Sequence, residues 1–257
     1  GDGRPLDHGL VAALQEAGCR LTEFAPDFVI LGDTISYHYE QIATGAEDNS
    51  VRVWDAATGE QLALLSGHTG RVLSVAFSPN GDLLASSSAD NTVRVWNLGD
   101  GSELFSLQME SSPRPFNVVA FSPDGSLLAG GNANGSVYLW DAGSGDELAL
   151  IETGGGEVID LAFNPAKETL VTVGRNEAVK MWSLDDGSEV AAAVGITDRM
   201  SSVAFSQDSR YLLIGNSDRI AWLWDVAAAQ ELNLNPSWED ALGSTNRVTT
   251  YLEFFPD

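Results

Sequence analysis

The chain has 257 residues, of which 44% are hydrophobic and 9% aromatic, so it is long enough to bury one sizeable core or two small ones. Its formal net charge of -24 repels phosphate backbones and anionic lipids, which argues against nucleic-acid and membrane-surface binding. The single cysteine, Cys19, excludes an internal disulfide and a thiolate metal cluster, and no apolar stretch approaches the roughly 18 residues that a membrane helix needs.

The first predicted element is an outer strand in residues 1–12. Its sequence GDGRPLDHGL aligns with GDGSELFSLQ at 99–108, which directly follows a run that ends in tryptophan. Pro5 fits an edge strand, where no backbone donor is needed. We therefore expect residues 1–12 to belong to a preceding or closing sheet.

The second element, residues 18–66, is expected to be a four-stranded sheet with an insertion. Phe24 precedes Trp54 by 30 residues, whereas later pairs of this kind are 19 residues apart. Residues 28–40 are therefore interpreted as about 11 added residues between the first two strands. An extended hairpin is the favoured interpretation of this addition, and a binding loop is the alternative.

Residues 71–108 show the unit most plainly. RVLSVAFSP alternates apolar and polar residues up to Phe77, and the turn sequence PNG follows. LLASSS and TVRVW predict a second and a third strand, and ELFSLQ after GDG predicts a fourth, outer strand. One unit is therefore expected to be a four-stranded antiparallel meander, too small to bury both apolar faces alone.

The same pattern returns in residues 115–151, 157–193 and 199–234. The tryptophans that end the third strands are Trp54, Trp96, Trp140, Trp182 and Trp224, spaced 42 to 44 residues apart. The phenylalanines that open the first turns are Phe77, Phe121, Phe163 and Phe205, each 19 residues before the next tryptophan. A fixed period of this length predicts an array of similar sheets in which each covers its neighbour.

The last segments contain a long loop and a further strand. The interval from Trp224 to Phe254 is longer than usual, and the excess falls in residues 235–246. Trp238 in this loop is a candidate recognition residue, and packing on the adjacent sheet is an equally weighted alternative. Residues 247–257, RVTTYLEFFPD, match RVLSVAFSPN and predict the first strand of another sheet.

The recurring segments SVRVWD, TVRVWN, SVYLWD, FSPNG, FSPDG and SGH closely resemble the WD-repeat β-propeller family, over essentially the whole chain. The resemblance implies an all-β propeller domain spanning residues 1–257. Its four-stranded antiparallel blades would number five near-complete ones, with partial strands at both ends. The chain would then be a window of a six- or seven-bladed ring. The resemblance also implies that the repeats bind other proteins and carry no chemistry of their own.

The resemblance further implies a hydrogen-bond set that ties each blade together. In the family this set comprises Trp, Ser or Thr, His and Asp, and the second blade has it as Trp96, Ser86, His68 and Asp90. The histidine is missing from the other blades, and asparagine replaces the aspartate in the third and fourth. We therefore expect a divergent propeller that relies on apolar packing.

The sequence contains no motif for catalysis or metal binding. None of the histidines has a second ligand at metal spacing, and no nucleophile elbow, P-loop or dinucleotide fingerprint is present. Acidic residues beside glycine fall where turns are expected, which favours turns over a calcium site. We therefore expect no enzyme, no cofactor and no metal, although catalytic groups drawn from separate blades would leave no linear motif.

Charge placement is expected to divide the propeller into two faces. Turns after the first and third strands carry most of the aspartates and should form an anionic face. The opposite face, around the channel mouth, should carry the arginines Arg71, Arg114, Arg175, Arg199 and Arg247. With Trp238, these are candidates for binding a carboxylate-bearing or acidic peptide, and the alternative is that each offsets a neighbouring acid.

The sequence therefore predicts a non-catalytic protein-protein interaction scaffold. Its partners would be other proteins, bound on the arginine-bearing face, with no nucleic acid and no direct membrane insertion. The alternatives are a structural subunit of a larger assembly and a propeller that binds a small ligand or metal at the channel mouth. The acidic, lysine-poor composition fits a cytoplasmic scaffold and an exported bacterial protein alike, with a preference for the extracytoplasmic location.

Overall fold

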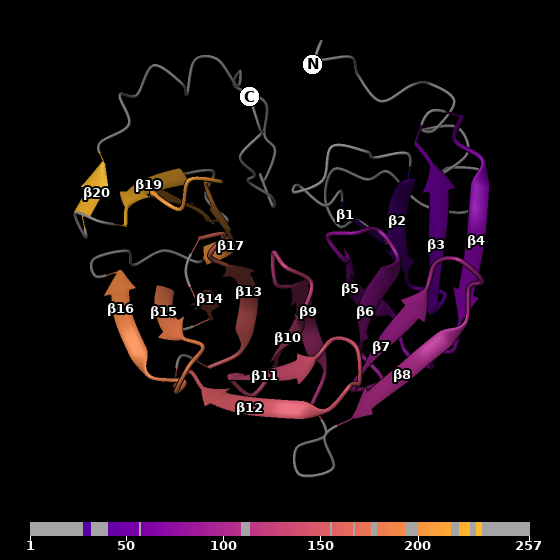
Figure 1. The fold of residues 1–257 in the computed structure, drawn as a ribbon, viewed down its shortest axis with the longest axis horizontal. Coiled ribbons are helices and arrows are strands. Elements are labelled where there is room, and N and C mark those ends of the chain that lie inside the picture. The colour runs from indigo at the N-terminus through magenta and orange to yellow at the C-terminus, as the bar shows by residue number, and fades with distance from the viewer. Residues whose placement is uncertain are drawn as a thin grey trace. The chain divides into compact units, whose positions relative to one another are not determined.

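The computed structural model describes residues 28–31, 41–56, 58–108, 114–154, 156–166, 168–175, 179–193, 200–216, 221–226 and 230–232. Within these residues it contains twenty β-strands and no helix, so the all-β prediction is confirmed (Figure 1). The described part of the chain thus has no helix long and apolar enough to cross a membrane. The chain divides into two compact units, residues 1–130 with 140–147 and residues 131–139 with 148–257.

The strands form five four-stranded sheets, each built from strands in chain order. The first two sheets are β1 Phe28–Leu31, β2 Gln41–Ala46, β3 Ser50–Asp55, β4 Gln61–Ser66, and β5 Val72–Phe77, β6 Leu83–Ser88, β7 Thr92–Asn97, β8 Glu103–Gln108. The third is β9 Phe116–Phe121, β10 Leu127–Asn132, β11 Ser136–Asp141, β12 Glu147–Glu152. The last two are β13 Val158–Phe163, β14 Thr169–Gly174, β15 Val179–Ser183, β16 Glu189–Ala193, and β17 Met200–Phe205, β18 Tyr211–Asn216, β19 Ala221–Asp225, β20 Gln230–Leu232. These antiparallel meanders are the four-stranded blades that the sequence predicts.

The predicted insertion at residues 28–40 is wrong in its first part. Phe28–Leu31 form β1, the first strand itself, and pair with β2 in the register Phe28↔Ala46 to Leu31↔Ala43. FVIL is a short apolar run containing a β-branched pair and an aromatic residue, which suits a buried strand. Alignment on Phe24, which lies outside the described residues, placed the strand too early in the chain.

Tight turns connect the first strand to the second strand in the second, third and fifth sheets. Gly81 and Gly125, in the turns FSPNG and FSPDG, have φ of 75° and 74°, a left-handed conformation that glycine adopts without strain. Ser209 takes the same kind of conformation in the fifth sheet, with φ of 59°. Their backbone N–H groups bond back to the serine three residues earlier, which closes the turn.

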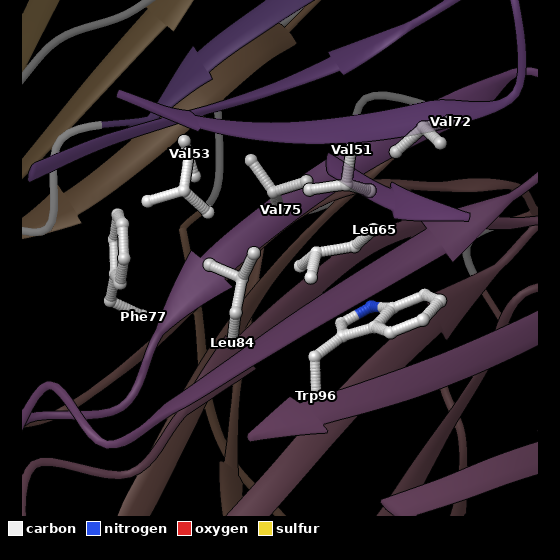
Figure 2. Packing of buried hydrophobic residues seen from close by; sticks show 9 residues of the cluster. Val51, Val53, Leu65, Val72, Val75, Phe77, Leu84 and Trp96 are labelled. Atoms are coloured by element: carbon white, nitrogen blue, oxygen red, sulfur yellow. The ribbon is translucent and has the colours of Figure 1, made fainter. Parts of the chain in front are cut away.

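Neighbouring sheets bury apolar side chains between them. In the first unit, Val51, Val53 and Leu65 of the first sheet face Leu84 and Trp96 of the second (Figure 2). In the second unit, residues of β14 and β15 pack against β17 and β18 in the same way. Packing of one sheet against the next shields these side chains from water, so adjacent repeats stabilise one another.

The predicted blade bounds and the assignment of the chain to one domain stay predictions. The described sheets span residues 28–66, 72–108, 116–152, 158–193 and 200–232. The predicted strands in residues 1–12 and 247–257 lie outside the described residues, as does the loop with Trp238.

Candidate protein-binding site

The structure joins Trp96, Ser86, His68 and Asp90 in one hydrogen-bonded chain. Trp96 Nε1 donates to Ser86 Oγ at 2.8 Å, and His68 Nε2 lies 2.8 Å from the same oxygen. His68 Nδ1 lies 2.9 Å from Asp90 Oδ2. A carboxylate only accepts hydrogen bonds, so the Nδ1 proton points to Asp90 and Nε2 accepts from the serine hydroxyl. This set of hydrogen bonds thus links β7, β6, the turn after β6 and the loop before β5.

Burial sets the protonation state of His68, and hydrogen bonds set that of Asp90. Burial lowers the pKa of His68 below 6.5, although the neighbouring Asp90 carboxylate opposes the shift. Burial would also raise the pKa of Asp90, but hydrogen bonds from Thr92, from the Thr69 N–H and from His68 outweigh it and hold that pKa at about 2. At neutral pH a neutral imidazole therefore faces an ionised carboxylate.

The same contacts hold Arg71 in place. Asp90 Oδ2 accepts the Thr69 N–H at 2.8 Å, and the carbonyl of Arg71 accepts the Ala89 N–H at 2.9 Å. The loop that carries Arg71 is therefore fastened at two points to the turn between β6 and β7. Sequence reasoning treated the hydrogen-bond set and the arginines separately, and the structure connects them.

Arg71 and Arg114 lie at one end of two adjacent strands in the first unit. Arg71 directly precedes β5 and Arg114 lies just before β9, and these two strands contact each other. The turns at the far ends also meet, because a Cβ built on Gly125 would lie 3.4 Å from Pro79 Cδ. The strands therefore run in the same sense, and both arginines lie at their shared N-terminal end. Both side chains are exposed, and neither forms an ion pair with any described residue.

Arg175 has a different environment in the second unit. It follows β14 and donates to Glu157 Oε2, although 72% of its side chain is exposed. Its charge is therefore offset by a neighbouring acid, as the alternative interpretation of the arginines expected. Arg199, Arg247 and Trp238 lie outside the described residues.

Aspartates cap the turns after the first and third strands. Asp124, for example, accepts hydrogen bonds from Ser122, from the backbone N–H of Ser126 and from its hydroxyl, and these lower the pKa of its carboxyl. The pKa values of Asp100, Asp141, Asp186 and Asp208 are lowered in the same way, by backbone and serine donors. The carboxyls of these five aspartates therefore stay ionised at neutral pH. No group of three or more His, Cys, Asp or Glu residues in the described ranges could hold a metal ion.

Two other indole–hydroxyl pairs escaped the sequence analysis. Trp54 Nε1 donates to Thr44 Oγ1 at 3.0 Å, and Trp182 Nε1 donates to Thr172 Oγ1 at 2.9 Å. In each pair the hydroxyl stands ten residues before the tryptophan, as Ser86 does before Trp96. A serine or threonine ten residues before the tryptophan, whether or not a histidine is present, is the sequence signal that identifies these pairs.

A partly buried carboxyl between two sheets was also missed. Asp160 Oδ2 accepts the backbone N–H of Val203 across the boundary between β13 and β17, at 2.9 Å. Ser74 makes the equivalent contact in the first unit, where its Oγ accepts the Val119 N–H at 3.3 Å. Burial raises the pKa of Asp160 to about 7, against the lowering effect of bonds from the N–H groups of Val203 and Leu161. Both acceptors stand at a β-bulge, three residues before the phenylalanine that ends the strand.

Comparison with known proteins places the repeats in one family of sequences. The family model described as "WD domain, G-beta repeat" matches residues 33–55, 59–97, 104–141 and 192–225, just over half of the chain. The matches skip most of the fourth sheet, which nevertheless has the same four antiparallel strands.

Individual relatives match one repeat closely or many repeats distantly. Nuclear distribution protein PAC1 of Mycosarcoma maydis is 46% identical over 43 residues, covering 17% of this chain and 10% of that protein. Ribosome assembly protein 4 of Chaetomium thermophilum is 48% identical over 44 residues, covering 17% and 8%. The periodic tryptophan protein 2 homolog of Dictyostelium discoideum is 23% identical over 233 residues, covering 82% and 23%. The matched part of this chain thus spans less than a quarter of each of these relatives.

Proposed function

This chain belongs to the WD domain, G-beta repeat family, and from that membership we propose that it is a non-catalytic scaffold that binds other proteins. Proteins of this family generally act as interaction scaffolds within complexes. Their blades supply a rigid frame, and recognition is left to the loops that the frame carries. The finer proposal concerns which loops of this chain bind.

We place the binding site at the exposed side chains of Arg71 and Arg114. The observation that carries this choice is that both lie at one end of β5 and β9 and have no acidic partner among the described residues. An exposed guanidinium with free donors can take a carboxylate in a two-pronged hydrogen bond. In a chain with 13 basic and 37 acidic residues, two cations at adjacent strand ends that form no ion pair with a described residue favour an acidic segment as the ligand.

The loop geometry supports this choice. Arg71 is held by its backbone carbonyl and by the Thr69–Asp90 contact, so little loop entropy is lost on binding. Arg175, already paired with Glu157, would join the site only by exchanging that partner. Arg199, Arg247 and Trp238 stay in the proposal as further contacts on the same sequence argument.

A selection experiment tests the proposal. A display library of random dodecapeptides would be selected on the full chain, and the enriched peptides measured by fluorescence anisotropy. We expect enriched peptides to carry clustered Asp and Glu. Arg71→Glu combined with Arg114→Glu should weaken their binding at least about tenfold, which is about 1.4 kcal/mol.

The control makes the same charge change as the single variant Arg71→Glu, with which it is compared, but at another place in the chain. Arg210 is exposed and lies in the turn after β17, so Arg210→Glu should leave peptide binding almost unchanged. Equal losses in the Arg210→Glu variant would mean that net charge and not a site governs binding. Enriched peptides without acidic residues would also contradict the proposal.

A second candidate is a structural subunit of a larger assembly. It is favoured by the name of one relative, transcription initiation factor TFIID subunit 5 of Caenorhabditis elegans. Gel filtration of native extract separates the two candidates, because a permanent subunit elutes entirely in a large complex. A scaffold with exchangeable partners would also be found free.

A further inference from the structure

The sequence contains two Asn–Gly pairs, Asn80–Gly81 and Asn134–Gly135. In such a pair the backbone nitrogen of the glycine can attack the side-chain amide carbon of the asparagine, because glycine has no Cβ to hinder the approach. Each pair lies in a turn between two strands of its sheet, Asn80–Gly81 between β5 and β6 and Asn134–Gly135 between β10 and β11. The same reactive dipeptide therefore occurs in two different surroundings.

The surroundings of Asn80–Gly81 are open. Both residues are exposed, and a Cβ built on Gly81 would come within 4 Å of no described residue other than its chain neighbours. The Gly81 N–H donates to the Ser78 carbonyl at 2.9 Å. The strands on either side are fastened separately, because the N–H of Ser78 donates to the Leu83 carbonyl and the N–H of Leu83 donates to Ser78 Oγ. The turn can therefore open locally while the strands stay paired.

The surroundings of Asn134–Gly135 are closed. Gly135 is buried, and a Cβ built on it would lie 2.5 Å from the Gly156 carbonyl oxygen. The carbonyl of Gly135 accepts both the N–H and the hydroxyl of Thr153, each at 2.9 Å. Rotating this peptide into a reactive geometry would disturb these two hydrogen bonds as well as the turn. Local opening is therefore less favourable here than at Asn80–Gly81.

The side chain of Asn80 is prepared for attack. Its Oδ1 accepts the Ser78 hydroxyl at 2.7 Å and the Asp82 N–H at 3.3 Å. The bond to Asp82 folds the side chain back towards the backbone of Gly81, which lies between the two residues. Donors on the amide oxygen also draw electrons from the amide carbon, so that carbon becomes a better target for the Gly81 nitrogen.

We propose that Asn80 is a site of spontaneous deamidation and that the fold protects Asn134 from the same reaction. The Gly81 nitrogen gives its proton to a solvent base and forms a bond to the amide carbon of Asn80. The bond from that carbon to Nδ2 then breaks, and the nitrogen takes up a proton and leaves as ammonia. Water opens the resulting five-membered imide at either carbonyl carbon, which leaves aspartate or isoaspartate at position 80.

The product sets a new charge beside an existing one. Asn80 Nδ2 donates to Asp82 Oδ2 at 2.9 Å, so a carboxylate at position 80 would face a second carboxylate. The equivalent turns avoid this arrangement. Two residues after Asp124 stands Ser126, whose hydroxyl donates to it, and two residues after Asp208 stands the cation Arg210. Deamidation should therefore weaken the turn between β5 and β6. This inference does not depend on the arginine site.

Peptide mapping of the full chain tests the proposal. The folded protein is incubated in mildly alkaline buffer, and tandem mass spectrometry of digested aliquots measures the conversion of amide to acid at each asparagine. We expect Asn80 to convert at least about tenfold faster than Asn134. The matched control is the same measurement in guanidinium chloride, where the two pairs should react at similar rates because the fold no longer distinguishes them.

Two sets of variants test the reasons given. Thr153→Val removes one of the two hydrogen bonds to the Gly135 carbonyl, so it should speed conversion of Asn134 about two- to tenfold and leave that of Asn80 unchanged. Asn80→Asp reproduces one product and should lower the melting temperature. Adding Asp82→Ser recreates the pairing of Asp124 with Ser126 and should restore it.

Three outcomes would overturn the proposal. Equal conversion of Asn80 and Asn134 in the folded protein would mean that the fold protects neither. A difference that persists unchanged in guanidinium chloride would place its cause in the local sequence instead of the structure. An Asn80→Asp variant as stable as the wild type would contradict the repulsion expected between positions 80 and 82.

Discussion

Relative to the wild type, replacing Asp160 by asparagine should make the protein progressively more stable as the pH rises. The carboxyl has a pKa of about 7 in the folded chain, raised from 3.8 by burial between β13 and β17. Because the folded state binds the proton more tightly, the stability linked to Asp160 is fully present below pH 3.8. It is lost as the pH rises through about 7.

The size of the effect follows from the two pKa values. A shift of about three units corresponds to roughly 4 kcal/mol in total, of which roughly 3 kcal/mol falls between pH 5 and pH 8. Asparagine stays neutral throughout and can still accept one backbone N–H. The free energy of unfolding of Asp160→Asn, relative to the wild type, should therefore rise by roughly 3 kcal/mol between pH 5 and pH 8.

Urea unfolding at the two pH values measures this difference directly. His68, whose lowered pKa makes the fold less stable at low pH, contributes equally to both proteins and cancels. Asp124→Asn serves as the control, because that carboxyl has a lowered pKa and is ionised at both pH values. A difference for Asp160→Asn that stays constant, or falls as the pH rises, would refute the argument.

Two further predictions concern the indole contacts. Ser86→Ala should lower the free energy of unfolding by at least about 2 kcal/mol, because the buried Trp96 N–H and His68 Nε2 both lose their partner. Chemical denaturation measures this loss, and an unchanged midpoint would contradict the prediction. Gly130→Ser restores a hydroxyl at the position of Ser86 yet should destabilise the third sheet by about 1–3 kcal/mol, since the new Cβ would lie 2.8 Å from Trp140 Cζ3. A higher melting temperature in this variant would show that Trp140 can move aside.

The sheets could be predicted from sequence because each repeat carries its own signals. The alternation up to Phe77, the turn glycines and the run that ends in Trp96 all act within one unit. Where those signals weaken the prediction failed, as for β1, whose four residues FVIL lack the phenylalanine–turn ending of the other first strands. Local patterns place strands well only when they are complete.

The site could be predicted only in part, because its properties depend on contacts between distant segments. The sequence assigns the same weight to Arg71 and Arg175, and only the structure shows that Glu157 lies beside the second. Asp160 is one acid among 37 acidic residues, and only contact with β17 makes it unusual. The Thr44–Trp54 and Thr172–Trp182 pairs were missed for another reason, since the search required a histidine that these sheets lack.

The shared core between the first two sheets has a consequence for synthesis on the ribosome. Val51, Val53 and Leu65 are covered by side chains such as Trp96, which are made about 40 residues later. At a synthesis rate of about 5–20 residues per second, this face of the nascent chain stays exposed to water for about 2–8 seconds. Released chains that end at Ser66 should therefore bind a hydrophobic dye, and released chains that end at Gln108 should bind less of it.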